Sequence, residues 1–181
     1  MNSGAEGPPV EEKTYNQTYQ GVYGEFGAAA HAQIVFLQTA IRPSQLDQLT
    51  LISEIPGSET WSVRDLFQRE VDTNRVTNSI LPYFQNKNKV KFFNPLTLTL
   101  LPIDTESFEI LSDPPALTER TIERNGRTWS SLEAEDYFRY RYIEGRMEWG
   151  ALDWNDESVK IVAIDGQHRL SALKRFKEDT A

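Results

Sequence analysis

Cysteine is absent from this 181-residue chain, and histidine occurs only at His31 and His168. Without cysteine the chain can form no disulfide and can offer neither a zinc–thiolate site nor a thiol nucleophile. It also lacks any stretch close to the roughly 20 apolar residues of a membrane span. A basic segment followed by an apolar one, the mark of a signal peptide, is missing at the N-terminus. We therefore expect a cytoplasmic protein with no membrane partner.

Basic residues are too few to cover the whole surface. The chain has 19 Lys and Arg against 27 Asp and Glu, which gives a formal net charge of −8. Surfaces that contact nucleic acid throughout are usually basic. Contact with DNA through a local basic patch stays compatible with this composition, but the acidic balance favours protein partners.

Domain organisation is predicted from the distribution of polar residues. Residues 1–27 are polar, contain glycine and proline, and show no hydrophobic period, which predicts a flexible leader that becomes ordered near residues 15–26. Residues 28–181 are predicted to form one domain, with a first core strand at residues 34–37. His31 precedes this strand, and a structural role is favoured for it over a ligand role.

Three helices are predicted between residues 43 and 84. Ser44 is the candidate N-cap of the first, which has four apolar residues at helical spacing: Leu46, Leu49, Ile52 and Ile55. Ser62 caps the second helix. Asp72 caps the third, in which Val76, Ile80 and Phe84 face the core and Pro82 bends or shortens the helix.

Alternating patterns predict strands in the second half of the chain. Leucine and threonine alternate from residue 96 to 101, as in a half-buried strand, and Asn125-Gly126 is a hairpin turn signal. Aromatic residues alternate with arginine over residues 137–142, and a small antiparallel meander follows from these segments. Two interpretations of residues 137–142 remain open: a ribbon that stacks bases and contacts phosphates, or a sheet with an aromatic core face and a charged solvent face.

The pattern most indicative of a site lies at residues 160–173. A β-branched apolar run ends at Asp165-Gly166, and helical spacing follows through Leu170 and Leu173, which predicts strand, tight turn and helix. Free N–H groups and the helix dipole at such a start favour an anion, and an arginine such as Arg169 adds a fork of donors suited to phosphate oxygens. Turns of this kind also occur in α/β proteins without any ligand.

The string Asp165-Gly166-Gln167-His168-Arg169 with Leu170-Ser171-Ala172 resembles the motif of the DGQHR-domain proteins, which include the DndB proteins of DNA phosphorothioation systems. It is also similar to the Gly-x-x-Arg loop of the ParB/sulfiredoxin fold, which binds nucleotide phosphates. Upstream, Gln68-Arg69, Arg75-Val76 and residues 92–96 resemble the corresponding part of DGQHR-domain proteins.

The resemblance implies a nucleotide switch or NTPase that uses ATP or CTP with Mg²⁺. Arg169 would hold a phosphate, and the turn of Gly166, Gln167 and His168 would cradle it. His168 would donate to a second oxygen, and Asp165 would orient Arg169, hold the metal or act as a base. The upstream arginines that would close over the nucleotide are Arg69 and Arg75.

The implied fold is α/β (α+β): a ParB/sulfiredoxin-like mixed sheet with flanking helices and an antiparallel meander. DndB-type proteins continue beyond their motif, so the domain is expected to be truncated at its C-terminal end. Two alternatives stay open for function: a non-catalytic DNA- or protein-binding module of a DNA modification or phage defence system, and a metal-dependent nuclease. The carboxylates considered for the nuclease are Asp153, Asp156, Glu157 and Asp165, the first three of which are expected to form an exposed acidic turn. A homo-oligomer is compatible with either alternative.

Overall fold

The computed structural model describes residues 15–26, 34–58, 71–88, 90–92, 94–113, 115–144 and 149–180. The chain divides into two compact units. Residues 1–39 and 115–156 make up the sheet unit, and residues 40–114 and 157–181 make up the helical unit. Each unit is composed of two separate chain segments.

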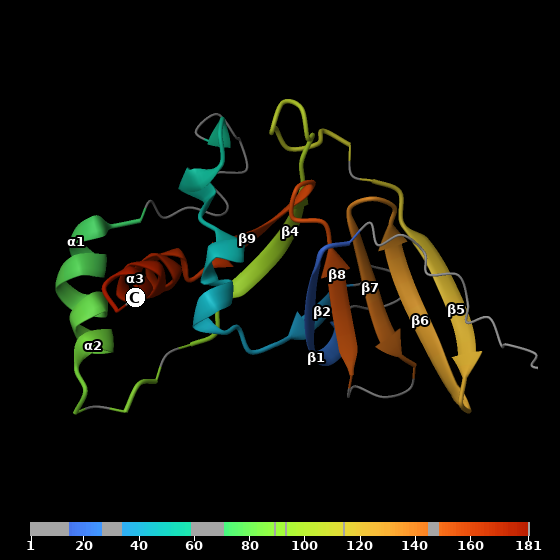
Figure 1. The fold of residues 1–181 in the computed structure, drawn as a ribbon, viewed down its shortest axis with the longest axis horizontal. Coiled ribbons are helices and arrows are strands. Elements are labelled where there is room, and N and C mark those ends of the chain that lie inside the picture. The colour runs from blue at the N-terminus through green and yellow to red at the C-terminus, as the bar shows by residue number, and fades with distance from the viewer. Residues whose placement is uncertain are drawn as a thin grey trace, which may run out of the picture. The chain divides into compact units, whose positions relative to one another are not determined.

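Six antiparallel strands make up the described part of the sheet unit (Figure 1). Their spatial order is β2-β1-β8-β7-β6-β5. Their bounds are β1 Gln17–Phe26, β2 Ile34–Gln38, β5 Thr118–Arg124, β6 Arg127–Ala134, β7 Phe138–Ile143 and β8 Gly150–Trp154. The meander predicted from the alternating segments is thus confirmed as the run from β5 to β8.

Strand β1 lies at the end of the predicted leader, where ordering was expected. It pairs with β2 on one side and with β8 on the other. Tyr19 and Tyr23, four residues apart and so on the same face of the strand, are both buried. The burial of these two large rings stabilises the strand, and the order expected near residues 15–26 is present as β1. Residues 1–14 lie outside the described residues.

Strand β2 is confirmed as a strand, but its predicted place in the core is wrong. It lies at one edge of the sheet, where Ile34 and Phe36 are 48% and 40% exposed. The apolar residues 34–37 therefore lie alternately on the two faces of the sheet, because neighbouring side chains of a strand point in opposite directions. His31 lies outside the described residues.

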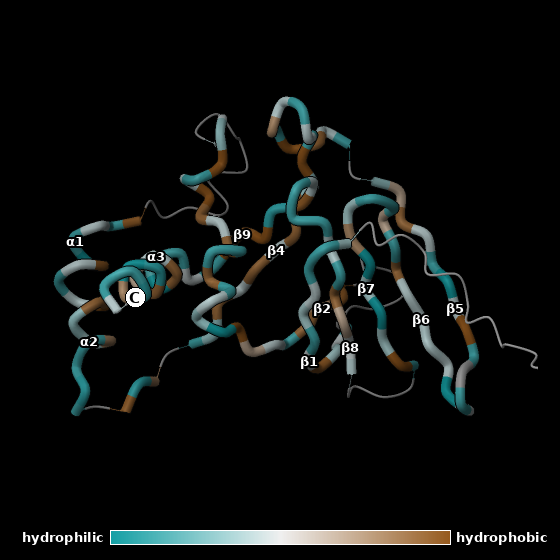
Figure 2. The backbone as a smooth tube through the Cα atoms, viewed as in Figure 1, coloured by the Kyte–Doolittle hydropathy of each residue, from teal (hydrophilic) through white to brown (hydrophobic). Residues whose placement is uncertain are grey.

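The hairpin between β5 and β6 turns at Asn125 and Gly126, as predicted. Both residues have positive φ, 54° and 68°, which is the backbone of a type I′ turn. The register Ile122↔Trp129 and Arg124↔Arg127 follows from this two-residue loop. Figure 2 shows that the tip of the hairpin is hydrophilic.

The helical unit contains a three-stranded mixed sheet in the order β3-β9-β4. Strand β3 is parallel to β9, and β4 is antiparallel to it. The bounds of the strands and helices are β3 Leu49–Thr50, β4 Thr97–Pro102, β9 Val159–Asp165, η1 Pro43–Gln48, η2 Ile52–Glu54, α1 Thr73–Arg75, η5 Val76–Ile80, α2 Leu81–Gln85 and α3 Gln167–Glu178. Figure 2 shows β9 as a mostly hydrophobic segment, as its central place requires. The mixed α/β class is confirmed.

The first predicted helix, at residues 43–55, is wrong. Two short 3₁₀ turns, η1 and η2, flank β3, whose Leu49 pairs with Ile161 of β9. The four residues that suggested the helix are all buried: Leu46, Leu49, Ile52 and Ile55. The N-cap is Arg42 and not Ser44. Parallel pairing of β3 supplies backbone hydrogen bonds that compete with the helix, while the apolar residues are buried in either conformation.

The third predicted helix is present, and its cap is confirmed. The Asp72 carboxylate accepts a hydrogen bond from the Arg75 amide at 3.1 Å. The helix runs through α1, the π-helical segment η5 and α2, with Pro82 in the first turn of α2. Proline has no N–H to donate, and the wide π turn immediately before it accommodates this missing bond. Val76 and Phe84 are buried in a cluster with Ala172 of α3.

The second predicted helix, which begins at Ser62, lies outside the described residues. No helix in the described ranges is long and apolar enough to cross a membrane.

Candidate functional site

The turn between β9 and α3 has the predicted strand–turn–helix geometry. Gly166 is the N-cap of α3 and has a φ of 87°, a left-handed conformation that L side chains rarely adopt. A Cβ at this position would lie 2.6 Å from Leu96 Cδ2 and 2.7 Å from Arg169 Nη2. The arginine side chain therefore folds back over the glycine and occupies the space that a larger residue would need.

Arg169 is held by a carboxylate but keeps one unsatisfied donor. Its Nη2 donates to Asp165 Oδ2 at 3.0 Å, the contact that the predicted role of Asp165 in orienting Arg169 requires. Its Nε is buried and has no hydrogen-bond partner among the described residues. A buried N–H without an acceptor costs about 1–3 kcal/mol, which an oxygen ligand would recover. The Arg169 side chain is only 21% exposed, so solvent water cannot take the full place of an oxygen ligand.

His168 connects the starts of two helices. Its Nε2 accepts a hydrogen bond from the Asp72 amide at 2.9 Å, next to the cap of α1. This nitrogen acts as an acceptor, so donation to a phosphate oxygen would have to come from Nδ1. Gln167, the first residue of α3, is buried. The contact brings the Asp72–Arg75 turn beside the start of α3.

The structure describes the predicted metal ligand Asp165 and one of the two upstream arginines. Arg75 is exposed at the end of α1, three residues after Asp72. Arg69 lies outside the described residues. Within the described ranges, no three His, Asp or Glu side chains are grouped as a metal site would require, and the carboxylate of Asp165 is paired with Arg169. The role of Asp165 as a metal ligand remains a prediction.

The expected exposed acidic turn near residue 153 is wrong in part. Asp153 lies in β8 and is 4% exposed, while the turn itself follows Trp154. The Asp156 carboxylate accepts hydrogen bonds from Asn16 and Gln17. Two of the carboxylates considered for a nuclease therefore bind other groups of the sheet unit. The sequence could not reveal this, because the donors from Asn16, Gln17 and Thr18 lie more than 130 positions away and the Arg139 and Arg141 donors belong to a neighbouring strand.

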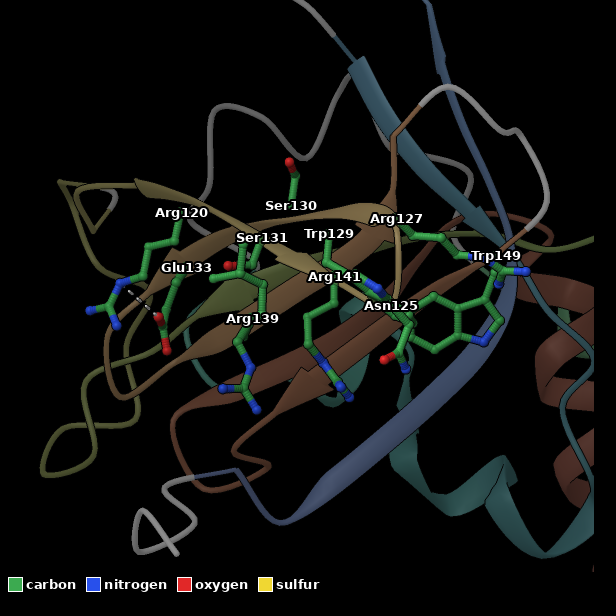
Figure 3. Close-up of a pocket in the computed structure, with 11 residues that line it drawn as sticks. Arg120, Asn125, Arg127, Trp129, Ser130, Ser131, Glu133, Arg139, Arg141 and Trp149 are labelled. Atoms are coloured by element: carbon green, nitrogen blue, oxygen red, sulfur yellow. Dashed lines mark ion pairs between the residues drawn. The ribbon is translucent and has the colours of Figure 1, made fainter. Parts of the chain in front are cut away.

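A second candidate site lies on one face of the sheet unit, and the sequence pointed only to its two arginines within residues 137–142. Its cavity of about 780 Å³ is lined by side chains of β5, β6 and β7 and by Trp149 (Figure 3). We call it the arginine–tryptophan face. Its defining residues are Arg120, Arg127, Arg139, Arg141, Trp129 and Trp149. The arginines and tryptophans of this face are visible in the sequence, but they are spread over four separate segments.

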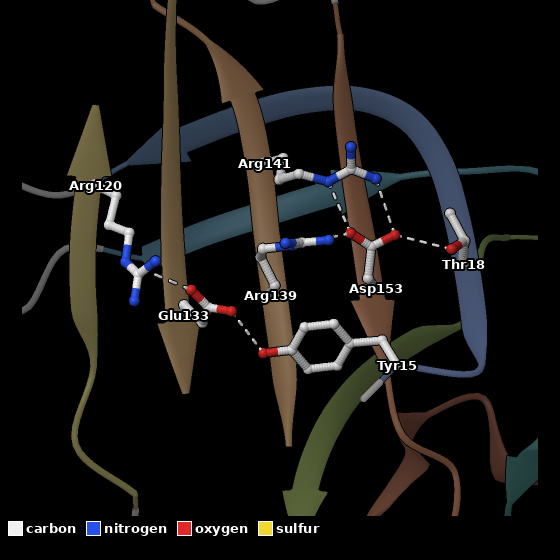
Figure 4. Close-up of polar contacts among 7 residues, drawn as sticks. All are labelled: Tyr15, Thr18, Arg120, Glu133, Arg139, Arg141 and Asp153. Carbon is white, nitrogen blue, oxygen red and sulfur yellow. Dashed lines mark hydrogen bonds and ion pairs between the residues drawn. The ribbon is translucent and has the colours of Figure 1, made fainter. Parts of the chain in front are cut away.

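Asp153 organises the centre of this face. Its carboxylate accepts two hydrogen bonds from Arg141, at 2.7 and 2.9 Å, and one from Arg139 at 3.4 Å (Figure 4). Thr18 of β1 donates a further bond at 2.8 Å. The Arg141 guanidinium also lies 6.0 Å from the Trp149 ring centroid. A single buried carboxylate thus fixes the directions of two arginines.

Glu133 plays a similar part at one side of the face. It accepts a hydrogen bond from the Tyr15 hydroxyl at 2.8 Å and lies 3.8 Å from Arg120 Nε (Figure 4). Burial, followed by the bond to Glu133, raises the pKa of Tyr15 above its ordinary value. Tyr15 therefore stays a neutral donor under ordinary conditions. Arg127 is exposed, and its guanidinium makes no ion pair with any residue that the structure describes.

The tyrosines and arginines of β7 lie on opposite faces of the sheet. Tyr140 is buried, and Tyr142 stacks on Tyr23 of β1 with ring centroids 4.4 Å apart. Arg139 and Arg141 point to the other side. A ribbon in which these tyrosines and arginines bind one ligand together is therefore wrong, and the alternative of an aromatic core face and a charged outer face is confirmed.

Comparisons of the chain with protein-family models, curated proteins and solved structures give no match. The DGQHR resemblance accordingly depends on the motif residues quoted above.

Proposed function

We propose that the chain binds a nucleotide through its phosphates at the turn from Asp165 to Arg169. The observation that carries the proposal is the buried Nε of Arg169, which has no hydrogen-bond acceptor among the described residues. It lies beside Gly166 at the start of a twelve-residue helix. A phosphate oxygen would satisfy this donor and would also interact favourably with the helix dipole.

The neighbouring Asp165 favours a phosphate that carries Mg²⁺ over a bare phosphate. The Asp165–Arg169 pair is neutral as a whole, so a free anion would have to compete with the carboxylate for the guanidinium. The Asp165 side chain is 73% exposed and can turn towards a cation without disturbing the core. Oxygen ligands of this type suit Mg²⁺, and ATP or CTP would bring the metal with it. Arg75 of α1 would contact the nucleotide from the side of His168.

The biological setting of the proposal comes from resemblance alone. A DndB-like, ParB-like domain would couple nucleotide binding to DNA modification, to its regulation or to phage defence. Hydrolysis would require Asp165 or His168 to position or activate a water, and release of inorganic phosphate measures that directly.

Thermal unfolding with and without nucleotide tests the proposal. ATP, CTP and GTP are added with and without Mg²⁺ to the wild type and to the Arg169→Ala and Arg169→Lys variants. At a nucleotide concentration about a hundredfold above Kd, the wild type should gain about 2.7 kcal/mol of unfolding free energy. Arg169→Ala should lose this gain, and Arg169→Lys should keep only part of it because lysine lacks the fork of donors.

The control for this experiment is Arg127→Glu in the sheet unit. It separates nucleotide bound at the turn from nucleotide attracted to the arginine–tryptophan face. If Arg169→Ala kept the full stabilisation while Arg127→Glu lost it, the turn would not be the binding site. If none of the three nucleotides stabilised the wild type, the proposal would also be contradicted.

A further inference from the structure

The arginine–tryptophan face carries positive charge on a chain that is acidic overall. Its four arginines face two carboxylates, Glu133 and Asp153, so two positive charges remain uncompensated. The chain as a whole has a formal net charge of −8. A polyanion would therefore be attracted to this face locally, and the attraction would decrease with salt.

The arginines are distributed over a length that exceeds one phosphate group. Arg120 lies four residues before Arg124, which pairs with Arg127 across the hairpin. Four residues of a strand correspond to about 14 Å, so Arg120 and Arg127 are suited to different phosphates of a chain. Arg141 lies across β6 from Arg120, because Ser131 pairs with Arg120 on one side and with Arg141 on the other. The positive charges thus extend both along and across the sheet.

Apolar rings lie among these charges. Trp129 and Trp149 are half-buried and meet edge to face, with ring centroids 5.2 Å apart. Ile122, which pairs with Trp129, is 61% exposed. An acidic protein segment would use the arginines but would gain little from these rings. Unpaired nucleic-acid bases stack on tryptophan, whereas the bases of a duplex are already stacked on one another.

The central arginine is held in place before any ligand arrives. Arg141 is fixed by two hydrogen bonds to Asp153 on one side and lies over the Trp149 ring (Figures 3 and 4). Because its side chain is already ordered, binding has less conformational entropy to lose. The guanidinium retains N–H donors that the Asp153 carboxylate does not use.

We propose that the arginine–tryptophan face binds single-stranded nucleic acid, with bases on Trp129 and Trp149 and phosphates on the arginines. This site is separate from the turn at Asp165, and it does not depend on nucleotide binding there.

Fluorescence anisotropy with a labelled oligothymidine of about 15 nucleotides, a length within known single-strand site sizes, tests the proposal. The full chain should bind it at low salt. Arg127→Glu should weaken binding on the order of tenfold and should reduce the slope of log K against log salt by about 0.7, the value for one phosphate contact on a single strand. Lys87→Glu, which makes the same charge change at an exposed residue of the helical unit, should leave both quantities nearly unchanged.

A second comparison, first with the wild type and then with two Trp149 variants, isolates the role of the rings. An abasic oligonucleotide of the same length retains the phosphates and should bind the wild type on the order of tenfold more weakly. Trp149→Phe should retain most of the affinity for oligothymidine, and Trp149→Ala should reduce it to the abasic level.

Four results would overturn the proposal. Equal affinity for the abasic and the thymidine strands would show that the rings do not stack bases. Equal competition by a polyglutamate peptide would indicate an acidic protein partner, and tighter binding of duplex DNA would indicate a duplex site. Absence of binding at low salt would exclude a polyanion site altogether.

Discussion

Gly166 meets two demands at once: a left-handed backbone and a close approach of two side chains. Its φ is 87°, and a Cβ there would lie within 3 Å of both Leu96 and Arg169. Gly57, in the same unit, has a φ of 74°, but a Cβ added there would meet nothing within 4 Å. A comparison of substitutions at the two glycines therefore distinguishes the cost of a left-handed backbone from the cost of steric overlap.

Alanine at these two positions should have unequal effects. Gly57→Ala should cost about 1–2 kcal/mol of unfolding free energy, the strain of a left-handed residue. Gly166→Ala should cost more, because Arg169 must also leave its place beside the turn, and nucleotide binding should weaken with it. Urea denaturation of both variants measures the difference. Equal costs would mean that Arg169 moves away from Gly166 without penalty.

Two hydrogen bonds meet at Asp72, the N-cap residue of α1. The Asp72 side chain accepts from the Arg75 amide, and the Asp72 amide donates to His168 Nε2. One residue thus caps its own helix and connects it to the start of α3. The two bonds use different groups of Asp72, so they can be removed one at a time.

Asp72→Ala removes the carboxylate cap and keeps the backbone amide that donates to His168, whereas His168→Ala removes this link and keeps the cap. Loss of the cap should cost about 1 kcal/mol and should speed amide hydrogen exchange in α1. His168→Ala should also speed exchange at the Asp72 amide, with the carboxylate cap of α1 kept. The double variant should be close to additive if the bonds are independent. Unchanged exchange in His168→Ala would contradict the link.

Elements fixed by local chemistry were predictable, and those fixed by distant pairing were not. Gly166 and the Asn125-Gly126 turn require particular backbone angles, so their residue types identified the β9–α3 turn and the β5–β6 hairpin. The segment around Leu49 showed helical spacing, which predicted a helix. Leu49 instead pairs with Ile161, more than 100 positions away, and this pairing makes the segment a short strand between 3₁₀ turns. Burial of Asp153 likewise depends on Arg139, Arg141 and Thr18, which adjacent residues do not reveal.

The two candidate sites show the same difference between local contacts and distant pairing. Asp165 and Arg169 are only four positions apart, so their pairing could be predicted. The arginine–tryptophan face arises only when β5, β6, β7 and Trp149 come together, so no single stretch of sequence contained it.

At the scale of the whole molecule, the two units should differ in how they respond to alkali. Five tyrosines with raised pKa values all belong to the sheet unit: Tyr15, Tyr19, Tyr23, Tyr140 and Tyr142. Burial is the first cause in each case, and it raises the pKa of Tyr19 to about 12. Since the folded state disfavours the tyrosinate form, the unfolded chain releases its protons first as the pH rises. The stability contributed by neutral burial is thus fully present below about pH 10 and is lost above it.

The sheet unit should therefore unfold in alkali in a transition that coincides with tyrosine ionisation. Near-ultraviolet absorbance of tyrosinate and circular dichroism, recorded together from pH 9 to about pH 12.5, should change over the same interval. Tyr140→Phe removes one of the ionisable groups together with its hydrogen bond to the Phe36 carbonyl. It should be less stable by about 1 kcal/mol at neutral pH but should lose less stability between neutral and alkaline pH than the wild type. Full ionisation of the tyrosines near pH 10 in a chain that keeps its native circular dichroism would contradict the burial of these five rings, because a buried hydroxyl cannot ionise at its ordinary pKa without first gaining access to water.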